Sequence, residues 1–435
     1  MPVTDAVPAA PTKTSVRRAV AASTAGSIIE WYDFQLYGVV AAIVLPTVFF
    51  PQSSVFAGVL LSFSTFFVGF IARPLGAVIF GHMGDRLGRK KALVATLMLM
   101  GMGTVGIGLT PGYASVGAFA PLLLALMRVL QGFGVGGEWS GAVLVAGESG
   151  RSSRQALLTS FPQASAMLGT SLATASVLLV GGLAGPEAFI EWAWRVPFLA
   201  SAALVLLGLW MRTGLSETST FTELREKGGL ERAPVLTAAR WHWRAIALGA
   251  FLKVGEMAPV YVFVSFVYTY GRNAGGLSQT TLLASVAVAA LLSALITPFM
   301  GHLGDRLGPI RIYLVGAALM AVQSLVYFAA ISSGNTVLAV GVILVSLVPY
   351  ALMFANEATI LTGLFPASVR YSGSSLAFNL AGILGGGPAP FIAAALYGTT
   401  GSWVLLSLYL LATVLVGAAS AVLIARRQNR RKVVA

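Results

Sequence analysis

Long apolar stretches fill most of the chain, and short groups of Gly, Pro or charged residues separate them. A helix needs about 20 apolar residues to cross the hydrocarbon core of a bilayer, and twelve stretches of this kind can be distinguished. The pattern therefore predicts an all-α polytopic membrane protein with twelve transmembrane helices. The predicted spans are residues 19–49, 55–80, 92–111, 117–147, 155–184, 192–212, 243–270, 279–300, 312–331, 335–363, 372–397 and 402–425.

The charged segment 214–240 interrupts this series between the sixth and seventh spans. On either side of it, an octapeptide follows the second span of each set of six: Gly-His-Met-Gly-Asp-Arg-Leu-Gly at 81–88 and Gly-His-Leu-Gly-Asp-Arg-Leu-Gly at 301–308. This repeat predicts two pseudo-symmetric six-helix bundles, an architecture in which transporters place the substrate site near the midplane. The predicted domains are a cytoplasmic segment 1–18, a bundle 19–213, a cytoplasmic linker 214–240, a bundle 241–425 and a basic cytoplasmic tail 426–435.

Composition excludes an ordinary soluble enzyme. Apolar residues make up 57% of the chain and charged residues only 10%, whereas a typical soluble protein has about 25% charged residues. The chain has no Cys and only three His, which excludes disulfides, thiolate metal sites and cysteine nucleophiles. No Gly-rich segment is followed by Lys-Ser or Lys-Thr, as a nucleotide loop would be. We expect no cofactor and no metal, and an ion gradient as the source of work.

The net charge of +13 follows the predicted topology. If the N-terminus lies in the cytoplasm, the cytoplasmic segments contain all of the 28 Lys and Arg residues except Arg73, Arg128, Arg195, Lys253 and Arg272. This distribution obeys the positive-inside rule, so the basic residues need no nucleic acid as a partner. We expect a multi-pass protein of the cell membrane, with both termini cytoplasmic, that acts on a small molecule as a monomer.

Eight ionisable residues fall within the predicted spans or next to them, where a charge costs about 3 kcal/mol on insertion scales. They are Glu30, Asp33, Arg73, Arg128, Glu138, Lys253, Glu256 and Glu357. We favour a pair between Asp33 and Arg128, because an acid held between an arginine and a closing cavity can take up and release a proton. A purely structural salt bridge is the alternative, and the two roles are compatible.

Two further acids are candidates for the transported proton. Glu30 lies three residues before Asp33, so the two carboxylates share one helix face. Glu138 lies ten residues after Arg128, almost three helical turns, and is either a second proton site or a residue that joins helices. The proton-coupling candidates are therefore Asp33, Arg128, Glu30 and Glu138. For Arg73, structural anchoring is favoured over contact with the substrate.

Polar residues of several spans are candidates for the substrate site. Lys253 and Glu256 lie three residues apart, so they form a local ion pair or, where this pair opens, Lys253 offers a point charge to a substrate carboxylate. The other polar residues more often join helices than bind ligands, unless several converge on one cavity. The candidate substrate-binding residues are Tyr37, Gln131, Gln163, Lys253, Glu256, Tyr261, Asn356, Glu357 and Asn379.

The repeated octapeptide predicts a gate on the cytoplasmic side. Asp85, at a helix end, is expected to pair with basic or helix-terminal groups when this side closes, and Glu148 could accept a charge from the same loop. Arg89 and Lys90 also orient the chain in the membrane, which is the simpler interpretation. The second copy continues with Pro309, so its latch is expected to be weaker or differently built. The candidate gating residues are Gly81, Asp85, Arg86, Gly88, Arg89, Lys90, Glu148, Asp305 and Arg306.

With these motifs, the sequence resembles the metabolite:proton symporters within the major facilitator superfamily. The resemblance rests on Glu-Trp-Tyr-Asp at 30–33, Ala-Arg-Pro-Leu-Gly at 72–76, the loop 81–91, Arg-Val-Leu-Gln-Gly at 128–132 and Trp-Ala-Trp-Arg-Val-Pro-Phe at 192–198. It implies proton-driven uptake, and it implies that a first-span acid pairs with Arg128. Known members carry shikimate, 2-oxoglutarate, citrate, or proline and betaine.

Within this family, the segments 370–373, 385–388 and 391–396 are most similar to the shikimate-type branch. The resemblance therefore implies a hydroxylated or cyclic organic acid as the substrate, a mono- or dicarboxylate. Proton-coupled uptake of zwitterionic osmolytes such as proline or betaine is the alternative. Drug efflux by proton antiport is less favoured, because the fifth span lacks the adjacent Gly-Pro signature of those exporters.

Overall fold

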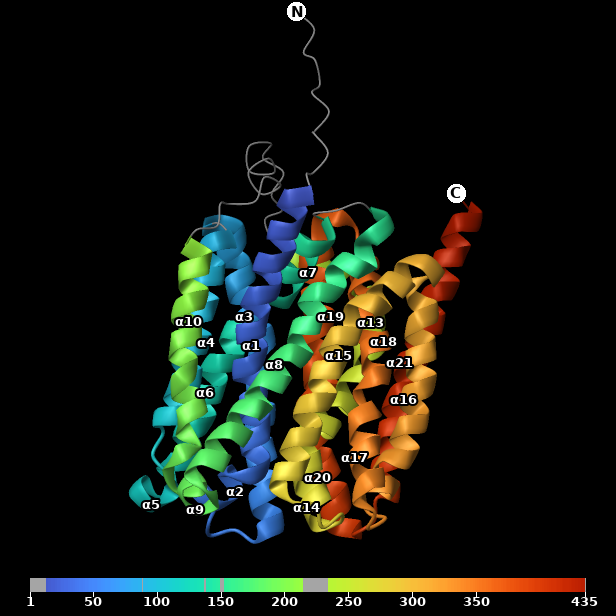
Figure 1. The fold of residues 1–435 in the computed structure, drawn as a ribbon. Helices are drawn as coiled ribbons and strands as arrows, with labels where there is room; N and C mark the ends of the chain where they lie inside the picture. Colours follow the sequence, from blue (N-terminus) through green and yellow to red (C-terminus); the bar gives the residue numbers. More distant parts are fainter. Residues whose placement is uncertain (1–12, 88, 137, 149–151, 214–233, 435) are drawn as a thin grey trace, which may run out of the picture.

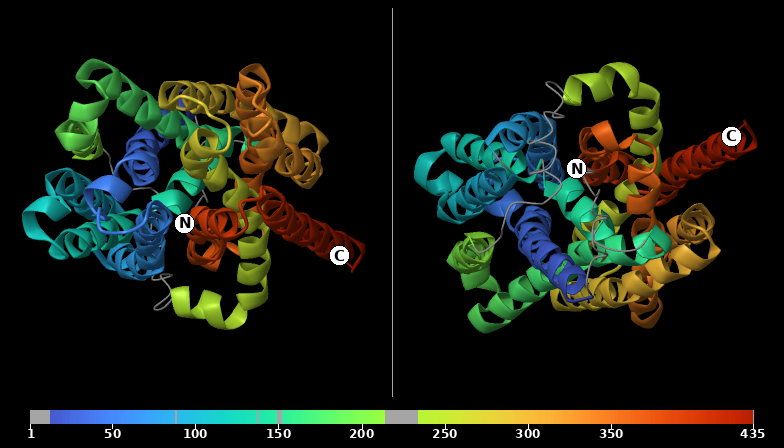
Figure 2. Two further views of the ribbon diagram at one scale, coloured as in Figure 1. Left: turned by 90° about the horizontal axis from the view of Figure 1, so that it is seen from below. Right: turned by 90° about the horizontal axis from the view of Figure 1, so that it is seen from above.

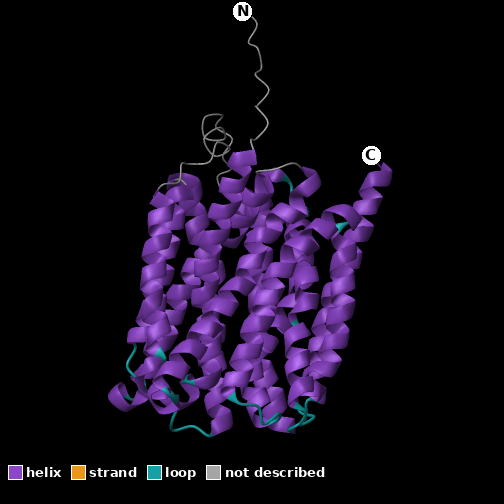
Figure 3. Cartoon of the chain, viewed as in Figure 1, coloured by secondary structure: helices purple, strands orange, loops and turns teal. Residues whose placement is uncertain are grey.

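The computed structural model describes residues 13–434 except 88, 137, 149–151 and 214–233. Within these residues the chain is almost entirely helical and contains no strand (Figure 3). This agrees with the all-α architecture expected from the apolar pattern. The physical reason is that a helix satisfies its backbone N–H and C=O groups internally, which the core of a bilayer demands of every spanning segment.

Six membrane-length segments in the described part of the first half follow the order of the predicted spans. They are α1 (Lys13–Ile43), α3 (Val55–Leu87), α4 (Arg89–Leu109), α6 (Phe119–Val135) with α7 (Glu138–Glu148), α8 (Gln155–Ala184) and α10 (Arg195–Thr213). The short helices between them are α2 (Leu45–Val48), α5 (Tyr113–Val116) and α9 (Pro186–Ala188).

The described part of the second half also contains six such segments. They are α13 (Trp243–Tyr261) with α14 (Val267–Asn273), α15 (Gln279–Leu307), α16 (Pro309–Ile331), α17 (Thr336–Val345) with α18 (Leu347–Thr362), α19 (Arg370–Ala381) with α20 (Pro388–Thr400), and α21 (Val404–Val434). Wider π-helical turns, 262–266 and 382–386, join the two parts of the first and fifth of these segments. α21 continues through most of the predicted tail 426–435, to Val434.

Nine of the described helices are long and apolar enough to cross a membrane, and ten are if the bent pair Pro186–Ala193 and Arg195–Trp210 forms one span. The remaining two segments are α1 and α4. α1 carries Glu30 and Asp33 among its apolar residues, and the apolar part of α4 is the shorter Val94–Leu109. The weakest spans by composition thus include the helix that carries candidate proton-binding acids.

The repeated octapeptides are helical, whereas the sequence suggested loops. Residues 81–87 form the last turns of α3, and residues 301–307 form the last turns of α15. α15 ends before Gly308, whose φ of 98° lies in the left-handed region that Gly adopts without strain. Gly304, inside α15, packs so closely that a Cβ atom there would collide with Asn356 of α18. Glycines of this motif therefore serve helix packing as well as helix termination.

The two halves of the chain lie side by side. α1 begins and α21 ends at the same end of the molecule, which we call the termini end (Figure 1). Seen along the helices, those of the first half gather on one side and those of the second half on the other (Figure 2). Contact between the halves is made by α8 with α15 and by α3 with α20. The predicted domain boundaries stay a prediction, since most of the linker lies outside the described residues and α12 (Pro234–Trp241) follows it.

Candidate functional site

Two groups of buried charged side chains lie inside the molecule, and the first is built around two arginines. Arg73 of α3 and Arg128 of α6 are fully buried. Arg73 Cζ lies 4.0 Å from the centroid of the Phe34 ring, and Arg128 Cζ lies 4.1 Å from that of the Tyr37 ring. We define the arginine cluster as Arg73, Arg128, Phe34, Tyr37, Phe66, Phe70 and Tyr261.

Helical spacing explains how this cluster forms. Phe66, Phe70 and Arg73 are four and three residues apart on α3, and Phe34 and Tyr37 are three apart on α1, so each set shares one helix face. Where the faces meet, the guanidinium groups lie over aromatic rings, whose π faces attract a cation. The sequence analysis selected Tyr37 but missed the three phenylalanines, although their spacing from Arg73 and Tyr37 was a readable signal.

The two arginines differ in their hydrogen bonds. Arg128 donates to the side chain of Gln131 and, over 3.1 Å, to the backbone carbonyl of Phe66. Gln131 Nε2 in turn donates over 3.2 Å to the carbonyl of Asp33, which fixes α6 against α1. None of the three guanidinium nitrogens of Arg73 has a hydrogen-bond partner among the described residues. Arg73 is thus held by ring contacts with Phe34 and Phe70, and a buried guanidinium without a hydrogen-bond partner suits an anion.

Tyr261 brings the second half of the chain into the arginine cluster. It ends α13, and its ring centroid lies 5.3 Å from that of Phe70 and 5.7 Å from that of Phe66. Within the described structure, its hydroxyl has no hydrogen-bond partner, and it lies near the guanidinium of Arg73. Unpaired polar groups from both halves therefore meet at one place, between aromatic walls.

Asp33 does not form the ion pair with Arg128 that the sequence suggested. The Asp33 side chain is fully buried, and neither carboxylate oxygen has a hydrogen-bond partner in the described part of the chain. The nearby hydroxyls of Thr104 and Ser201 donate to the carbonyls of Met100 and Phe198 in their own helices. Arg128 donates a hydrogen bond to Gln131 instead, so the carboxylate of Asp33 has no donor among the described residues.

The other two candidate acids of the first half are also buried. Glu30 and Glu138 are each 4% exposed, and Glu30 acts electrostatically on Arg73. The argument that placed Glu138 on the face of Arg128 assumed a continuous helix. α6 ends at Val135 and α7 begins at Glu138, and residue 137 between them lies outside the described residues, so this face assignment stays a prediction.

The second charged group lies in the second half of the chain. Lys253 Nζ lies 2.6 Å from Glu256 Oε1 and 3.0 Å from Glu357 Oε1, and each of these side chains is at most 1% exposed. We call these three residues the lysine triad. Lys253 and Glu256 form the local pair that their spacing on α13 suggested, and Glu357 of α18 joins it. The span Trp243–Asn273 is the most enclosed described span, with 94% of its apolar window buried, which keeps the triad away from lipid.

Aromatic rings from both halves cover the triad. Lys253 Nζ lies 4.5 Å from the ring centroid of Phe378 and 5.9 Å from that of Trp139. Trp139, from α7, stacks on Phe378, from α19, with ring centroids 4.3 Å apart. Trp139 Nε1 donates to Gln163 Oε1 over 2.7 Å, and Gln163 Nε2 donates to the carbonyl of Phe354 over 3.0 Å. Gln163, a substrate-binding candidate, thus helps to hold the two halves together above the triad.

The two candidate asparagines join helices. Asn356 Nδ2 donates to the carbonyls of Met300 and Leu352, over 3.2 and 3.0 Å. Asn379 Nδ2 donates over 2.8 Å to the carbonyl of Gly136, at the end of α6 in the other half. Asn356 Oδ1 has no partner among the described residues, but several candidate residues with unsatisfied polar atoms come together only in the described parts of the arginine cluster and the lysine triad.

Only the second copy of the gating motif can be located in detail. Asp305 Oδ1 and Oδ2 accept hydrogen bonds from the backbone N–H groups of Ala156 and Leu157, over 2.8 and 2.9 Å. Asp305 of α15 therefore caps the start of α8 in the other half, where N–H groups lack helical partners. Arg306 is exposed. The other candidates have side chains outside the described residues: Gly81, Asp85, Arg86, Gly88, Arg89, Lys90 and Glu148.

Contacts between the halves close the space around both charged groups. Toward the termini end, Asp305 meets α8 and Asn379 meets Gly136. Toward the other end, Ser171 Oγ donates over 2.9 Å to the carbonyl of Ala287. The charged side chains of the arginine cluster and of the triad are buried in this arrangement, which we call occluded.

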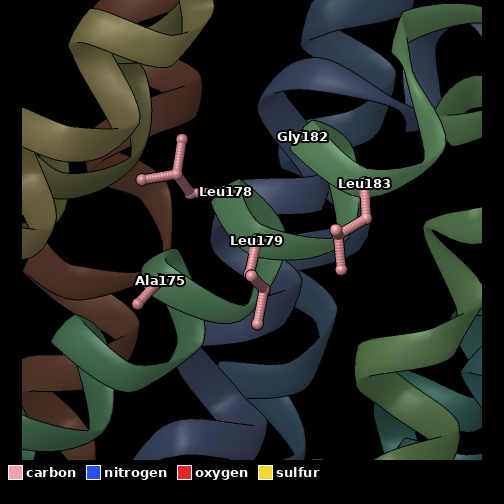
Figure 4. Close-up of a pocket in the computed structure, with 5 residues that line it drawn as sticks. All are labelled: Ala175, Leu178, Leu179, Gly182 and Leu183. Carbon is pink, nitrogen blue, oxygen red and sulfur yellow. The ribbon is translucent and has the colours of Figure 1, made fainter.

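A groove of about 350 Å³ lies on the outside of α8, lined by Ala175, Leu178, Leu179, Gly182 and Leu183 (Figure 4). Each of these residues is apolar, and Leu179 and Leu183 are largely exposed. A surface of this kind faces the acyl chains of a bilayer and offers no polar group to a hydrophilic ligand.

Comparison with known proteins places this geometry in context. The sequence matches the Major Facilitator Superfamily over residues 21–390. It is 38% identical to the shikimate transporter of Escherichia coli over 417 residues, covering 95% of each chain. It is 40% identical to the inner membrane metabolite transport protein YhjE of Escherichia coli over 385 residues, covering 87% of this chain and 88% of that protein.

The chain is also similar to a more distant transporter and to a solved transporter structure. The proline/betaine transporter of Salmonella typhimurium is 30% identical over 428 residues, covering 95% of this chain and 84% of that protein. The partially occluded inward open structure of the xylose transporter XylE from E. coli has a TM-score of 0.74 at 16% identity, covering 95% of this chain and 98% of that one. This structural likeness confirms the fold expected from the sequence.

Proposed function

Because the chain belongs to the major facilitator superfamily and is a multi-pass membrane transporter, not an enzyme, we propose that it takes up a small organic acid with protons by alternating access. The proposed substrate is shikimate-like or another mono- or dicarboxylate. The 38% identity to a shikimate transporter supports this substrate class. The occluded arrangement of the two halves supports a cycle in which the same site opens first to one side and then to the other.

The observation that carries the proposal is the unpaired guanidinium of Arg73. It is fully buried, its nitrogens have no partner within the described residues, and Arg128 is close enough to act on it electrostatically. Two cations in a dry site repel one another, so the site favours an anion near both. A carboxylate suits the site because a guanidinium presents parallel N–H donors to its two oxygens.

The rest of the arginine cluster supports a small, partly apolar acid. Phe34, Phe66 and Phe70 surround the guanidinium groups with ring surfaces that could pack against a carbon ring. The hydroxyl of Tyr261 could donate to the substrate from the second half of the chain. A substrate that touches Arg73 and Tyr261 together would bind both halves at once, which favours the closed state only when the site is filled.

Asp33 is the proposed proton carrier of the first half. A buried carboxylate without donors or a cation costs much more as an anion than as a neutral acid. In the occluded state, Asp33 therefore holds a proton. When the halves separate and water reaches α1, hydration lowers the free-energy cost of the Asp33 carboxylate. Asp33 then releases its proton.

Zwitterion uptake is the second candidate, and the lysine triad is the observation that favours it. The triad has two carboxylates for one ammonium, so it could receive the cationic group of betaine or proline while the arginine cluster holds the carboxylate. The 30% identity to a proline/betaine transporter supports this alternative.

Uptake by the purified protein in liposomes tests the choice. We expect an alkaline lumen to drive accumulation of labelled shikimate, but not of betaine or of the uncharged methyl ester of shikimate. If betaine is accumulated and shikimate is not, zwitterion uptake is the function and the organic-acid proposal is wrong. If none of a panel of mono- and dicarboxylates is accumulated, the organic-acid proposal fails.

Replacing Asp33 tests the proton. We expect Asp33→Asn to lower the accumulation limit about tenfold per unit of pH gradient while substrate exchange across the membrane continues, because the neutral amide keeps the shape of the acid but releases no proton. Glu187→Asn, at an exposed position, is the control. Undiminished uphill transport by Asp33→Asn would exclude the proposed role.

The remaining parts of the proposal concern the assembly and its orientation. We propose that the transporter works as a monomer without a cofactor, since both charged groups are built within one chain. The distribution of Lys and Arg supports cytoplasmic termini. Labelling of a cysteine introduced after Val434, in intact and permeabilised cells, tests the orientation: reaction in intact cells would reverse it.

A further inference from the structure

The lysine triad contains one negative charge too many. Lys253 contacts two glutamates, Glu256 and Glu357, and the described structure shows no second cation in contact with either carboxylate. If all three groups were ionised, a net charge of −1 would be enclosed in a span that is almost completely buried. Buried ionic groups are stable when their charges balance. One proton added to the two carboxylates balances the triad.

The geometry of the triad suits such a shared proton. The two glutamates approach the same Lys253 Nζ, through Glu256 Oε1 and Glu357 Oε1, and the two carboxyl groups are close enough to interact directly. Glu256 Oε2 and Glu357 Oε2 have no donor among the described residues. Two carboxylates held this close cannot both ionise without cost, as in other carboxylate pairs that share one proton.

Among the described residues, no other charged group near the triad takes over this role. The titratable side chains that face the glutamates are tyrosines: Tyr261 on α13, Tyr313 on α16 and Tyr350 on α18. The hydroxyl of Tyr313 is occupied, since it donates to the carbonyl of Leu252 over 2.5 Å. A neutral phenol cannot balance a carboxylate, so Lys253 and the added proton remain the only balancing charges among the described neighbours.

The cover of the triad comes from both halves of the protein. Trp139 of the first half stacks on Phe378 of the second, and both rings lie over Lys253. A separation of the halves toward the termini end would move Trp139 away from Phe378 and give water access to the carboxylates. Such a state would allow the proton to exchange.

We propose that Glu256 and Glu357 share one transported proton beside Lys253, so that the transporter carries a proton site in each half. The proposal rests on the proposed proton-coupled function and adds a second site, distinct from Asp33. Two protons would then accompany each substrate anion. At a fixed pH gradient of one unit and zero membrane potential, each transported proton raises the limiting accumulation of the anion about tenfold.

The first test needs no substrate. Infrared difference spectroscopy of the full-length protein in detergent detects the C=O stretch of protonated carboxyl groups, apart from the bands of carboxylates. We compare Glu357→Gln and Glu256→Gln with the unaltered protein, with Asp33→Asn and with the exposed-site control Glu191→Gln. Each triad variant keeps one glutamate to pair with Lys253, so charge balance and folding are preserved.

We expect a protonated carboxyl band at neutral pH of which one component disappears in either triad variant. The same component stays in Asp33→Asn and Glu191→Gln. If both triad variants keep the full band, the triad holds no proton and the inference is wrong. Because this measurement needs no transport, it gives a result even if organic acids are not the substrate.

The second test measures the ratio of protons to substrate from the accumulation limit in liposomes, with labelled shikimate as the probe. We expect the limit to fall about tenfold in Glu357→Gln and, independently, about tenfold in Asp33→Asn. An unchanged limit in Glu357→Gln, with shikimate still accumulated, overturns the second site and leaves the proposed function intact. Absence of shikimate accumulation by the unaltered protein overturns the proposed substrate, and the infrared result then decides the proton site alone.

Discussion

The two buried charged groups are opposite in kind. Among the described residues of the arginine cluster and its surroundings, Arg73 has no hydrogen-bonding partner, and Arg128 is held by an amide and a carbonyl, with no carboxylate bonded to either. In the lysine triad, two carboxylates compete for one ammonium. The difference indicates that the two groups bind different ligands. An excess of cationic donors favours binding of an anionic substrate, whereas an excess of carboxylates favours binding of a proton.

The surroundings of the two groups match this division. Tyr261 from the second half completes the arginine cluster, so that group lies across the contact between the halves. The three charged residues of the triad all belong to the second half, and the described part of the first half contributes the covering ring of Trp139. A substrate must touch both halves to couple their movement, but a proton can be held by one half and released when the cover moves.

Removing the charge of Arg73 is expected to have the largest effect, and it tests whether the arginine cluster binds the substrate. We expect Arg73→Gln to lower the rate of shikimate uptake at low concentration roughly 100-fold, because a buried charge-assisted contact to the substrate is lost. Arg73→Lys should recover part of it, since a point charge replaces a bidentate donor. Arg272→Gln, at an exposed position, is the control. Uptake that is unchanged in Arg73→Gln would place the substrate elsewhere.

Removing the ammonium from the triad should act on stability more than on recognition. We expect Lys253→Met to lower the free energy of unfolding by about 3 kcal/mol, because two facing carboxyl groups lose the one cation that contacts them in the described structure. The double variant Lys253→Met, Glu357→Gln should recover part of this loss, since it removes the like-charge contact. Thermal unfolding in detergent measures both. A double variant less stable than Lys253→Met would contradict the description of the triad as carboxylate-rich.

The smallest expected effect comes from a single hydroxyl. Tyr261→Phe keeps the ring that packs on Phe66 and Phe70 but removes the unpaired hydroxyl. We expect the KM for shikimate to rise about fivefold with little change in the maximal rate, since one hydrogen bond contributes about 1 kcal/mol. Tyr397→Phe, outside both charged groups, is the control. Equal KM values for Tyr261→Phe and the unaltered protein would show that the second half makes no contact through this group.

The sequence predicted the spans, the repeat and the buried ionisable residues, because each leaves a local trace in composition or spacing. The pair of Lys253 and Glu256 was visible for the same reason, since three residues on a helix fix a common face. Phe66, Phe70 and Arg73 could have been found by this rule as well.

What the sequence did not predict is which helices face one another. Asp33 and Arg128 carry complementary charges, but Gln131 lies between α6 and α1 and bonds to Arg128 and to the Asp33 backbone. Glu357 joins Lys253 from a helix some hundred residues further along the chain. The rotation of each helix about its axis decides such partnerships, and it follows from the packing of every neighbour together. The prediction that the octapeptides form loops was wrong for a related reason. Glycine occurs in turns, but it also occurs inside helices where another helix packs closely against it.

The contact of Asp305 with the start of α8 determines which substitutions α8 can accept at the contacted positions. Its acceptors meet main-chain N–H groups of Ala156 and Leu157, which every residue except proline provides. No particular side chain on α8 is needed for this contact, whereas the carboxylate of Asp305 is needed to accept both bonds. Mutational scanning of these two positions should show broad tolerance, with proline as the intolerant substitution.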